Sequence, residues 1–227
     1  MRSKRYSKIA EKIDITKTYP ISDALKALKE VSSAKFDESV EVHVKLGIDA
    51  AKADQAIRGV VNLPHGSGKT KRVIVFADSA KAEEGKKAGA DIVGGEDLIA
   101  SIKQTEKIDF DVAVATPDMM KKLAPIAKIL GPKGLMPSPK TETVTMDIAK
   151  VVGELKKGKA EFRSDDSGNV HISIGKVSFG EQKLAENFTE FYNVIKNSRP
   201  AAAKGEFIKS VHVSSTMGPS FKINTRA

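Results

Sequence analysis

The segment Gly66-Ser67-Gly68-Lys69-Thr70 is the stretch that most resembles a phosphate-binding loop. A complete P-loop places another glycine at the position that Leu63 occupies here. A P-loop also begins a helix, so that backbone N–H groups converge on the phosphate, whereas the apolar run after this segment predicts a strand. We therefore interpret the segment as a connection between domains. A small α/β phosphate- or nucleotide-binding enzyme that uses Gly66–Thr70 is the alternative.

The side chains that most often perform catalysis or bind metals form no recognisable motif. The histidines are His43, His65, His171 and His212, and none lies three or four residues from another, so a helical metal site is absent. Three of them, His43, His171 and His212, fall at polar-face positions of predicted strands; they could converge in space, but solvated histidines are the simpler interpretation. No Gly-x-Ser-x-Gly sequence marks an activated serine. The chain has no cysteine, which excludes disulfides, thiolate metal sites and a cysteine nucleophile. The residues alone leave a Ser-His-Asp arrangement open, but our expectation is a protein that is not an enzyme and that needs no cofactor and no metal.

The segment Leu130–Pro137 predicts a rigid surface loop. Gly131-Pro132 ends the preceding helix, and Gly134 permits a tight backbone turn. Lys133 is then displayed at the tip, with neighbouring backbone amides available to an anion. The loop either contacts phosphate or only terminates a helix, and the residues alone leave both possibilities open.

The chain is basic along its whole length. Its 227 residues carry 38 Lys and Arg against 29 Asp and Glu, a formal net charge of +9. Residues 1–66, 67–159 and 160–227 contribute +3, +4 and +2, so the excess is not concentrated in a tail. This balance suggests a polyanionic partner whose binding surface the fold must assemble. Because no apolar run approaches the roughly 18 residues of a membrane span and no signal sequence is evident, we expect a cytoplasmic protein without a membrane partner.

Both ends of the chain predict strands with one solvated face. Apolar residues alternate with polar ones over 40–48, 170–174 and 211–213, which is typical of an antiparallel sheet. Helical spacing of apolar residues predicts one helix from about Ile21 to Val31 and another from Leu184 to Ile195. These ends therefore favour an α+β domain.

The middle of the chain has a different pattern. Continuous apolar runs at 73–76, 91–93 and 111–115 predict strands that are covered on both faces. Helices are predicted near 79–88, 98–102, 116–130 and 148–155, and Pro125 inside the third predicts either a kink or two short helices. This alternation of strands and helices favours a small three-layer α/β domain.

The simplest organisation is an α+β discontinuous first domain, residues 1–66 and 160–227, with an inserted three-layer α/β (Rossmann-like) second domain, residues 67–159. The chain then crosses between domains twice, at Gly66, Ser67 and Gly68 and again at Gly158 and Lys159. Two adjacent crossings form a natural hinge. Two consecutive domains without an insertion are the alternative.

Four segments, spread in order over nearly the whole chain, carry a resemblance to a known family. They are Lys35–Val42, Leu130–Pro137, His171–Phe179 and Ser214–Pro219. They resemble the signatures of the L-one family of large-subunit ribosomal proteins, in its bacterial form. That family usually has Thr at the position of Ser39, and because Ser keeps the hydroxyl, we expect the corresponding contact to survive.

The resemblance implies two domains, the second inserted into the first, and a first domain that binds large-subunit rRNA at the mobile ribosomal stalk. It also implies repression of translation through binding to the protein's own operon mRNA, a transient or indirect relation to tRNA in the exit site, and a monomer off the ribosome. The RNA-binding residues that it assigns are Lys35, Phe36, Ser39, Glu41, His171, Gly175, Lys176, Ser178, Thr216, Met217 and Gly218. A secondary RNA contact is assigned to Gly131, Lys133 and Gly134.

These residue types suit the recognition of folded RNA, which is read through its backbone, its 2′-hydroxyls and its unstacked bases. Lys35 and Lys176 would supply charge to phosphates, Phe36 and Met217 would supply apolar contacts, and the hydroxyls would meet ribose or phosphate oxygens. A structural role is the alternative for each of them, as a core side chain, a turn residue or a solvated polar group.

Overall fold

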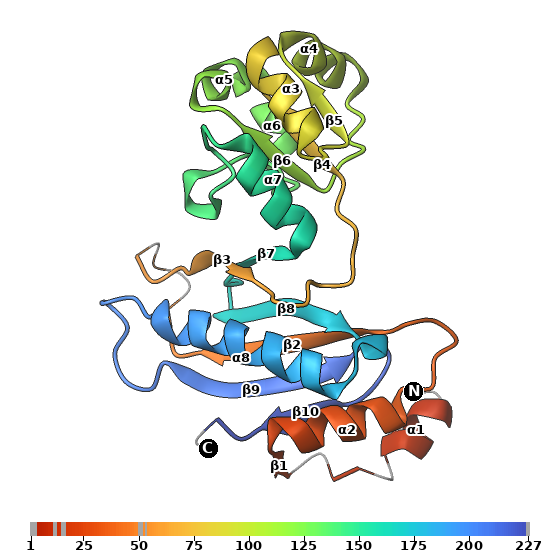
Figure 1. Ribbon diagram of the computed structural model, residues 1–227. Helices are drawn as coiled ribbons and strands as arrows, with labels where there is room; N and C mark the ends of the chain where they lie inside the picture. The colour runs from red at the N-terminus through yellow and green to blue at the C-terminus, as the bar shows by residue number, and fades with distance from the viewer. Residues whose placement is uncertain (1–3, 11–12, 15–16, 50–51, 53, 226–227) are drawn as a thin grey trace. The chain divides into compact units, whose positions relative to one another are not determined.

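The fold is α+β, as the sequence predicts, in a computed structural model that describes residues 4–10, 13–14, 17–49, 52 and 54–225. Contacts between Cα atoms divide the chain into two compact units. Unit 1 comprises Met1–Gly68 and Ala160–Ala227, and unit 2 comprises Lys69–Lys159. Figure 1 labels the helices and strands of both units.

Unit 1 is built on a five-stranded sheet in the order β1-β10-β9-β2-β8. Strand β2 (Ser39–Leu46) lies between β8 (Asn169–Lys176), which is an edge strand, and β9 (Ile208–Ser215). It is antiparallel to both of these neighbours. Strand β10 (Ser220–Ile223) is antiparallel to β9, and the short β1 (Thr18–Tyr19) pairs with it in parallel. The antiparallel pairing places the start of β2 beside the ends of β8 and β9.

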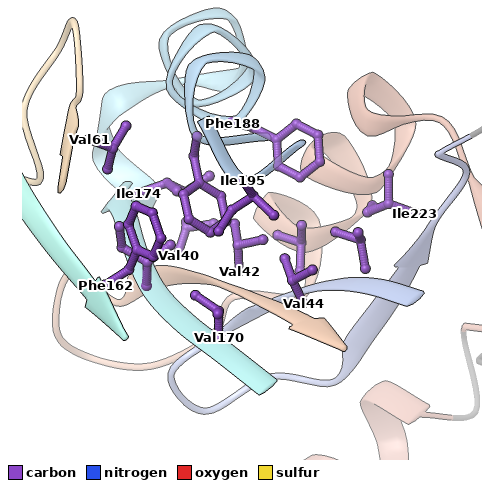
Figure 2. Close-up of a cluster of buried hydrophobic side chains, with 14 of the residues drawn as sticks. Val40, Val42, Val44, Val61, Phe162, Val170, Ile174, Phe188, Ile195 and Ile223 are labelled. Atoms are coloured by element: carbon purple, nitrogen blue, oxygen red, sulfur yellow. The ribbon is translucent and has the colours of Figure 1, made fainter. Parts of the chain in front are cut away.

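Helices α2 (Ile21–Val31) and α8 (Glu181–Asn197) cover one face of this sheet, and the shorter α1 (Lys4–Ala10) precedes them (Figure 1). The alternation in β2 directs Val40, Val42 and Val44 toward the helices, where all three are buried. Figure 2 shows them packed with Phe188 and Ile195 of α8 and with residues of the neighbouring strands. Burial of this apolar surface is the main stabilising contribution to the unit.

A two-stranded ribbon, β3 (Arg58–Asn62) with β7 (Lys159–Arg163), completes unit 1. Phe162 of β7 packs edge to face on Phe191 of α8, with ring centroids 5.9 Å apart. A 3-10 turn, η3 (Val177–Phe179), follows β8. On the polar face of the sheet, Glu41, His43 and Lys45 of β2 are partly exposed.

Unit 2 is a parallel sheet in the order β5-β4-β6, with helices on both faces. The strands are β4 (Val73–Phe76), β5 (Ile92–Gly94) and β6 (Val112–Ala115). Helix α7 (Ile148–Lys157) packs with Val73 and Val75 on one face, and Gly85 of α3 (Ser79–Lys87) lies beside Val75 there. Residues of α4 (Glu96–Thr105), α5 (Pro117–Lys122) and α6 (Ala127–Leu130) pack with Ile74 and Phe76 on the other face.

Pro125 divides the predicted helix 116–130. Helix α5 ends at Lys122, a 3-10 turn, η1 (Ala124–Ile126), contains the proline, and α6 follows it directly. Of the two predicted possibilities, two short helices are therefore found, because proline lacks the N–H that a continuous helix needs at this point. A further 3-10 turn, η2 (Pro139–Thr141), lies between α6 and α7.

Asn187 fixes the first predicted hinge segment to unit 1. Its side chain is fully buried in α8, and its amide donates to the carbonyl oxygens of Gly66 (3.0 Å) and Ile174 (2.7 Å). Its carbonyl oxygen accepts the backbone N–H of His65 at 3.1 Å. Ser67 is also buried. This chain segment is therefore held against α8 and β8 as far as Gly66.

Lys159 fixes the second predicted hinge segment to unit 2. Only 2% of its side chain is exposed, and its ammonium group contacts Glu142 at 2.5 Å and Glu154 at 2.9 Å. Burial opposes the charge, but the two carboxylates outweigh burial and raise the pKa of Lys159. Lys71 donates to the carbonyl oxygen of Lys159 at 2.6 Å and so joins the two ends of the unit.

Candidate nucleic-acid interface

Three chain segments that are far apart in sequence meet where β2 begins and where β8 and β9 end. We call residues 35–41, 175–178 and 214–218 the strand-end surface. It gathers ten of the eleven residues that the family resemblance assigns to RNA binding. The antiparallel register brings them together, because Ser39 pairs with Lys176 on one side and Val40 pairs with Ser215 on the other.

Thr216 and Ser39 lock two of these segments together. The backbone N–H of Ser39 donates to the Thr216 hydroxyl at 3.0 Å, and the backbone N–H of Thr216 donates to the Ser39 carbonyl oxygen at 3.1 Å. The Thr216 residue is nevertheless exposed. Its hydroxyl thus fixes the loop, while the residue as a whole remains exposed.

Glu38 and Asp37 hold the loops from their inner side. Both lie inside the segment Lys35–Val42, but their residue types did not predict a functional role. Glu38 is 2% exposed and accepts the backbone N–H groups of Met217 (2.9 Å) and Ala34 (3.3 Å). The carboxylate of Asp37 accepts the Ser178 hydroxyl at 2.7 Å and the Ser178 backbone N–H at 3.2 Å. These bonds fix the positions of the exposed residues before any ligand arrives.

Lys176 is partly engaged within the protein. Its ammonium group donates to the Ser39 hydroxyl at 3.0 Å and to the Asp37 carbonyl oxygen at 3.1 Å. Ser39 itself is buried, so its hydroxyl positions Lys176 in this structure. Arg5, which the sequence reasoning did not select, donates to the Met217 carbonyl oxygen at 2.8 Å and adds a second cation beside the surface. Lys35 is exposed.

Two glycines of the strand-end surface are required by packing. A Cβ atom at Gly218 would lie 2.4 Å from the Ser215 hydroxyl oxygen, and one at Gly175 would lie 2.8 Å from the Leu184 side chain. Gly218 also donates its N–H to the Ser215 carbonyl oxygen at 3.2 Å, which closes the turn that presents Met217. Any larger residue would displace this turn or the core beneath it.

Phe36 and Met217 expose apolar surface on the strand-end surface. Their exposed fractions are 55% and 50%, and Met146 of unit 2 is the remaining large apolar side chain exposed to this extent among the described residues. The core alternative for Phe36 is therefore wrong, since a core ring is buried. Exposed rings and thioethers held on a fixed backbone can stack on unpaired bases or pack on riboses.

Glu41 lies on the polar face of the sheet, opposite Ser173 of β8 and Ser214 of β9. The buried hydroxyl oxygens of Ser173 and Ser215 have no hydrogen-bond partner within the protein. Unpartnered buried hydroxyls are uncommon and need an explanation. Both lie in the strands that end at the strand-end surface.

His171 lies apart from the other assigned residues. It pairs with His43 of β2, two residues farther along the sheet than Glu41, and His43 in turn pairs with His212 of β9. The Nδ1 atoms of His43 and His171 are 2.8 Å apart. These three histidines form a row across the polar face. They therefore converge, although separately solvated histidines were the simpler prediction from the sequence. Among the described residues, no group of three His, Asp or Glu side chains is arranged to hold a metal ion.

The secondary contact residues form an exposed turn in unit 2. Gly134 donates its N–H to the Gly131 carbonyl oxygen at 3.0 Å and has a left-handed φ of 70°. Lys133 is exposed between them. The alternative nucleotide site fails on geometry, because Gly66–Thr70 leads into strand β4 and no helix begins there. No helix in the described part of the chain is long and apolar enough to cross a membrane.

Comparison with known proteins gives a consistent result. The model of the ribosomal protein L1p/L10e family matches residues 28–219. A protein of Thermosipho melanesiensis that is named large ribosomal subunit protein uL1 is 53% identical over 222 residues, covering 98% of this chain and 96% of that protein. Proteins with the same name from Thermobifida fusca (53% over 226 residues, 100% of this chain) and Thermosipho africanus (52% over 222 residues, 98% of this chain) each align over 96% of their own length.

These matches make the chain a structural ribosomal protein that binds rRNA and has no enzymatic activity. The chain belongs to the ribosomal protein L1p/L10e family. The resemblance predicted from four short segments is thereby confirmed.

Proposed function

We propose that the chain binds large-subunit rRNA at the mobile stalk of the large ribosomal subunit, in the cytoplasm, through the strand-end surface of unit 1. The observation that carries the proposal is that Phe36 and Met217 expose apolar side chains on the same surface. Their loops are held in place by the buried Glu38 carboxylate and by the Thr216 hydroxyl. Lys35, Lys176 and Arg5 supply positive charge beside them. Such a surface combines charge with shape and suits an irregular RNA better than a uniform helix.

A titration of a stem–internal-loop fragment of the large-subunit rRNA tests this assignment. We expect tight binding that prefers this fragment over a scrambled RNA of equal length at moderate salt. Met217→Ala should weaken binding at least tenfold, and Met146→Ala, which truncates an equally exposed methionine of unit 2, should not. Charge alone would attract the RNA if the protein bound both RNAs equally and if its affinity fell steeply as salt was raised. That result would overturn the assignment.

We propose further that the protein represses translation by binding its own operon mRNA at the same surface. A messenger that folds into the same shape as the rRNA site would compete for the same residues. Footprints on the rRNA and on the operon mRNA should therefore protect similar folds, and Met217→Ala should reduce both. A messenger footprint that survives Met217→Ala would contradict the use of one shared surface.

Units 1 and 2 are proposed to act as two domains that move about Gly66, Ser67, Gly68, Gly158 and Lys159, and this movement is proposed to assist release of deacylated tRNA from the exit site. Asn187 holds His65 and Gly66 to unit 1, and Glu142 and Glu154 hold Lys159 to unit 2. Gly66 and Lys159 would therefore be the fixed ends beside which the backbone turns. The secondary RNA contact at Gly131, Lys133 and Gly134 is part of the same proposal.

A disulfide that bridges the units should slow tRNA release from ribosomes if the movement is needed, and unchanged release would contradict it. Off the ribosome we expect a monomer.

A further inference from the structure

The polar face of the unit 1 sheet carries a continuous row of titratable side chains. Cross-strand register places His171, His43 and His212 opposite one another on β8, β2 and β9, and Lys222 of β10 lies opposite His212. The row begins two residues beyond Glu41 of the strand-end surface, a distance of about 7 Å along a strand. It is therefore an extension of that surface across the same sheet.

His43 is the centre of the row. Its Nδ1 atom is 2.8 Å from Nδ1 of His171, and its Nε2 atom is 3.1 Å from the Ser214 hydroxyl oxygen. At 2.8 Å one of the two Nδ1 atoms must carry a hydrogen and the other must accept it. The pair can accept one additional proton without breaking this contact, because a protonated His43 would donate from both ring nitrogens. With a second added proton, both facing Nδ1 atoms would carry a hydrogen, so neither could accept and the contact would become repulsive.

Two members of the row, His43 and His212, lie in surroundings that favour the neutral imidazole. Burial, followed by the proximity of His171, lowers the pKa of His43, although Glu41 opposes this effect. Burial and then Lys222 lower the pKa of His212. Hydrogen bonds from Asn169 lower the pKa of Asp165 to about 2, so this carboxylate stays charged at weakly acidic pH. Its Oδ2 atom is 3.5 Å from Nε2 of His171.

The charged side chains beside the row cancel one another. Glu41 and Asp165 carry two negative charges, and Lys45 and Lys222 carry two positive ones. With neutral imidazoles the face therefore adds little attraction for RNA, and each added proton gives it one positive charge. A phosphate group beside a protonated imidazole would replace the solvation that burial has removed.

We propose that the histidine row of His171, His43 and His212, together with Lys222, is a proton-linked contact for the RNA phosphate backbone. RNA that extends from the strand-end surface across the sheet takes up one to two protons on the row as it binds. This inference rests on the proposed function, since it concerns the same RNA and an adjoining part of the same face. Its consequence is that the protein binds RNA more tightly as the pH falls below neutrality.

The test is the dissociation constant of the rRNA fragment at pH 7.5, 6.5 and 5.5 at fixed ionic strength. For the natural chain we expect affinity to rise by up to about tenfold per pH unit for each proton taken up. A variant with His43→Asn, His171→Asn and His212→Asn should bind with an affinity that changes little over this range. His65→Asn is the matched control, because His65 contacts Glu186 away from this face, and it should retain the full pH dependence.

A flat pH profile for the natural chain, or an equally steep profile for the triple variant, would overturn the proposal. Where the triple variant does not fold, as judged by circular dichroism, the exposed single variant His171→Asn replaces it and should reduce the slope. Calorimetry at pH 6.5 in two buffers of different ionisation enthalpy then counts the protons directly, and zero uptake by the natural chain would refute the proposal. Failure of the proposed function looks different, since the fragment would then bind no better than a scrambled RNA at every pH.

Discussion

The Thr216 hydroxyl lies 3.0 Å from the backbone nitrogen of Ser39, across 177 residues of sequence. This hydrogen bond joins the end of β9 to the start of β2 and, with the backbone bond beside it, closes the edge of the strand-end surface. Thr216 therefore has two roles, to hold the Ser39 backbone and to face the proposed RNA. Substitutions can separate them.

Thr216→Val removes the hydroxyl and leaves the Ser39 N–H without its acceptor. We expect unfolding free energy to fall by about 1–2 kcal/mol, because a buried donor loses its partner. RNA affinity should fall by at least tenfold. Thr189→Val is the control, since the Thr189 hydroxyl donates only to its own helix and is exposed. Chemical denaturation and RNA titration measure the two effects, and equal behaviour of the two variants would contradict the role of Thr216.

Phe36→Ala should weaken RNA binding without unfolding the protein. The ring is more than half exposed, so its removal should change unfolding free energy by less than about 0.5 kcal/mol. If a base or ribose packs on the ring, affinity should fall by about tenfold, because such stacking contributes about 1–3 kcal/mol. Phe36→Leu, which keeps apolar area but not the aromatic face, should lie between. Affinity that is unchanged in Phe36→Ala would remove Phe36 from the interface.

Asn187→Leu should destabilise unit 1 strongly. The substitution leaves the carbonyl oxygens of Gly66 and Ile174 and the N–H of His65 without their present partner. We expect a loss of about 3 kcal/mol, since each buried polar group left unsatisfied costs about 1–3 kcal/mol and some will reach water. Asn193→Leu changes an exposed residue of the same helix and should cost far less. Thermal unfolding of the two variants compares them directly, and similar melting temperatures would refute the anchoring role.

Lys159→Met should destabilise unit 2 by about 2 kcal/mol, because two carboxylates lose their cation while keeping access to water. The pKa of Lys159 is raised from 10.5, so its contribution is fully present below that pH and is lost as pH rises through the folded value. The natural chain should therefore lose stability above pH 10.5 more steeply than the variant. Denaturation curves collected across this alkaline range check both points, and parallel profiles would contradict the ion-pair assignment.

Local patterns identified most elements because each depends on neighbours in sequence. The alternation at 40–48 and the apolar run at 73–76 correspond to β2 and β4, and Pro125 marked the break between α5 and α6. The predicted strand 211–213 was shorter than β9, which runs from Ile208 to Ser215. Apart from Ile208, its outer residues are Lys and Ser, which become strand through pairing with β2, and a local pattern does not contain that pairing.

The candidate site was predicted less completely from the residues themselves. The residue types of Phe36 and Thr216 alone are also compatible with a structural role, in the core or in a turn. Only the family resemblance indicated that they contact RNA. Glu38 and Arg5 escaped selection because their roles depend on partners that lie far away in the chain. His43, His171 and His212 were predicted at polar-face positions of strands, where convergence was the less favoured alternative to solvated side chains. Only the strand register shows that they form one row.

The sequence by itself determined the α+β class, the absence of thiol chemistry, the distributed positive charge and, through four short segments, the family. These follow from composition and from periodicities of two and 3.6 residues, which are properties of neighbouring positions. The tertiary structure decided which polar residues meet. Antiparallel pairing set Ser39 beside Thr216 and His43 between His171 and His212, because register joins residues more than a hundred positions apart and the chemistry of each contact depends on both partners.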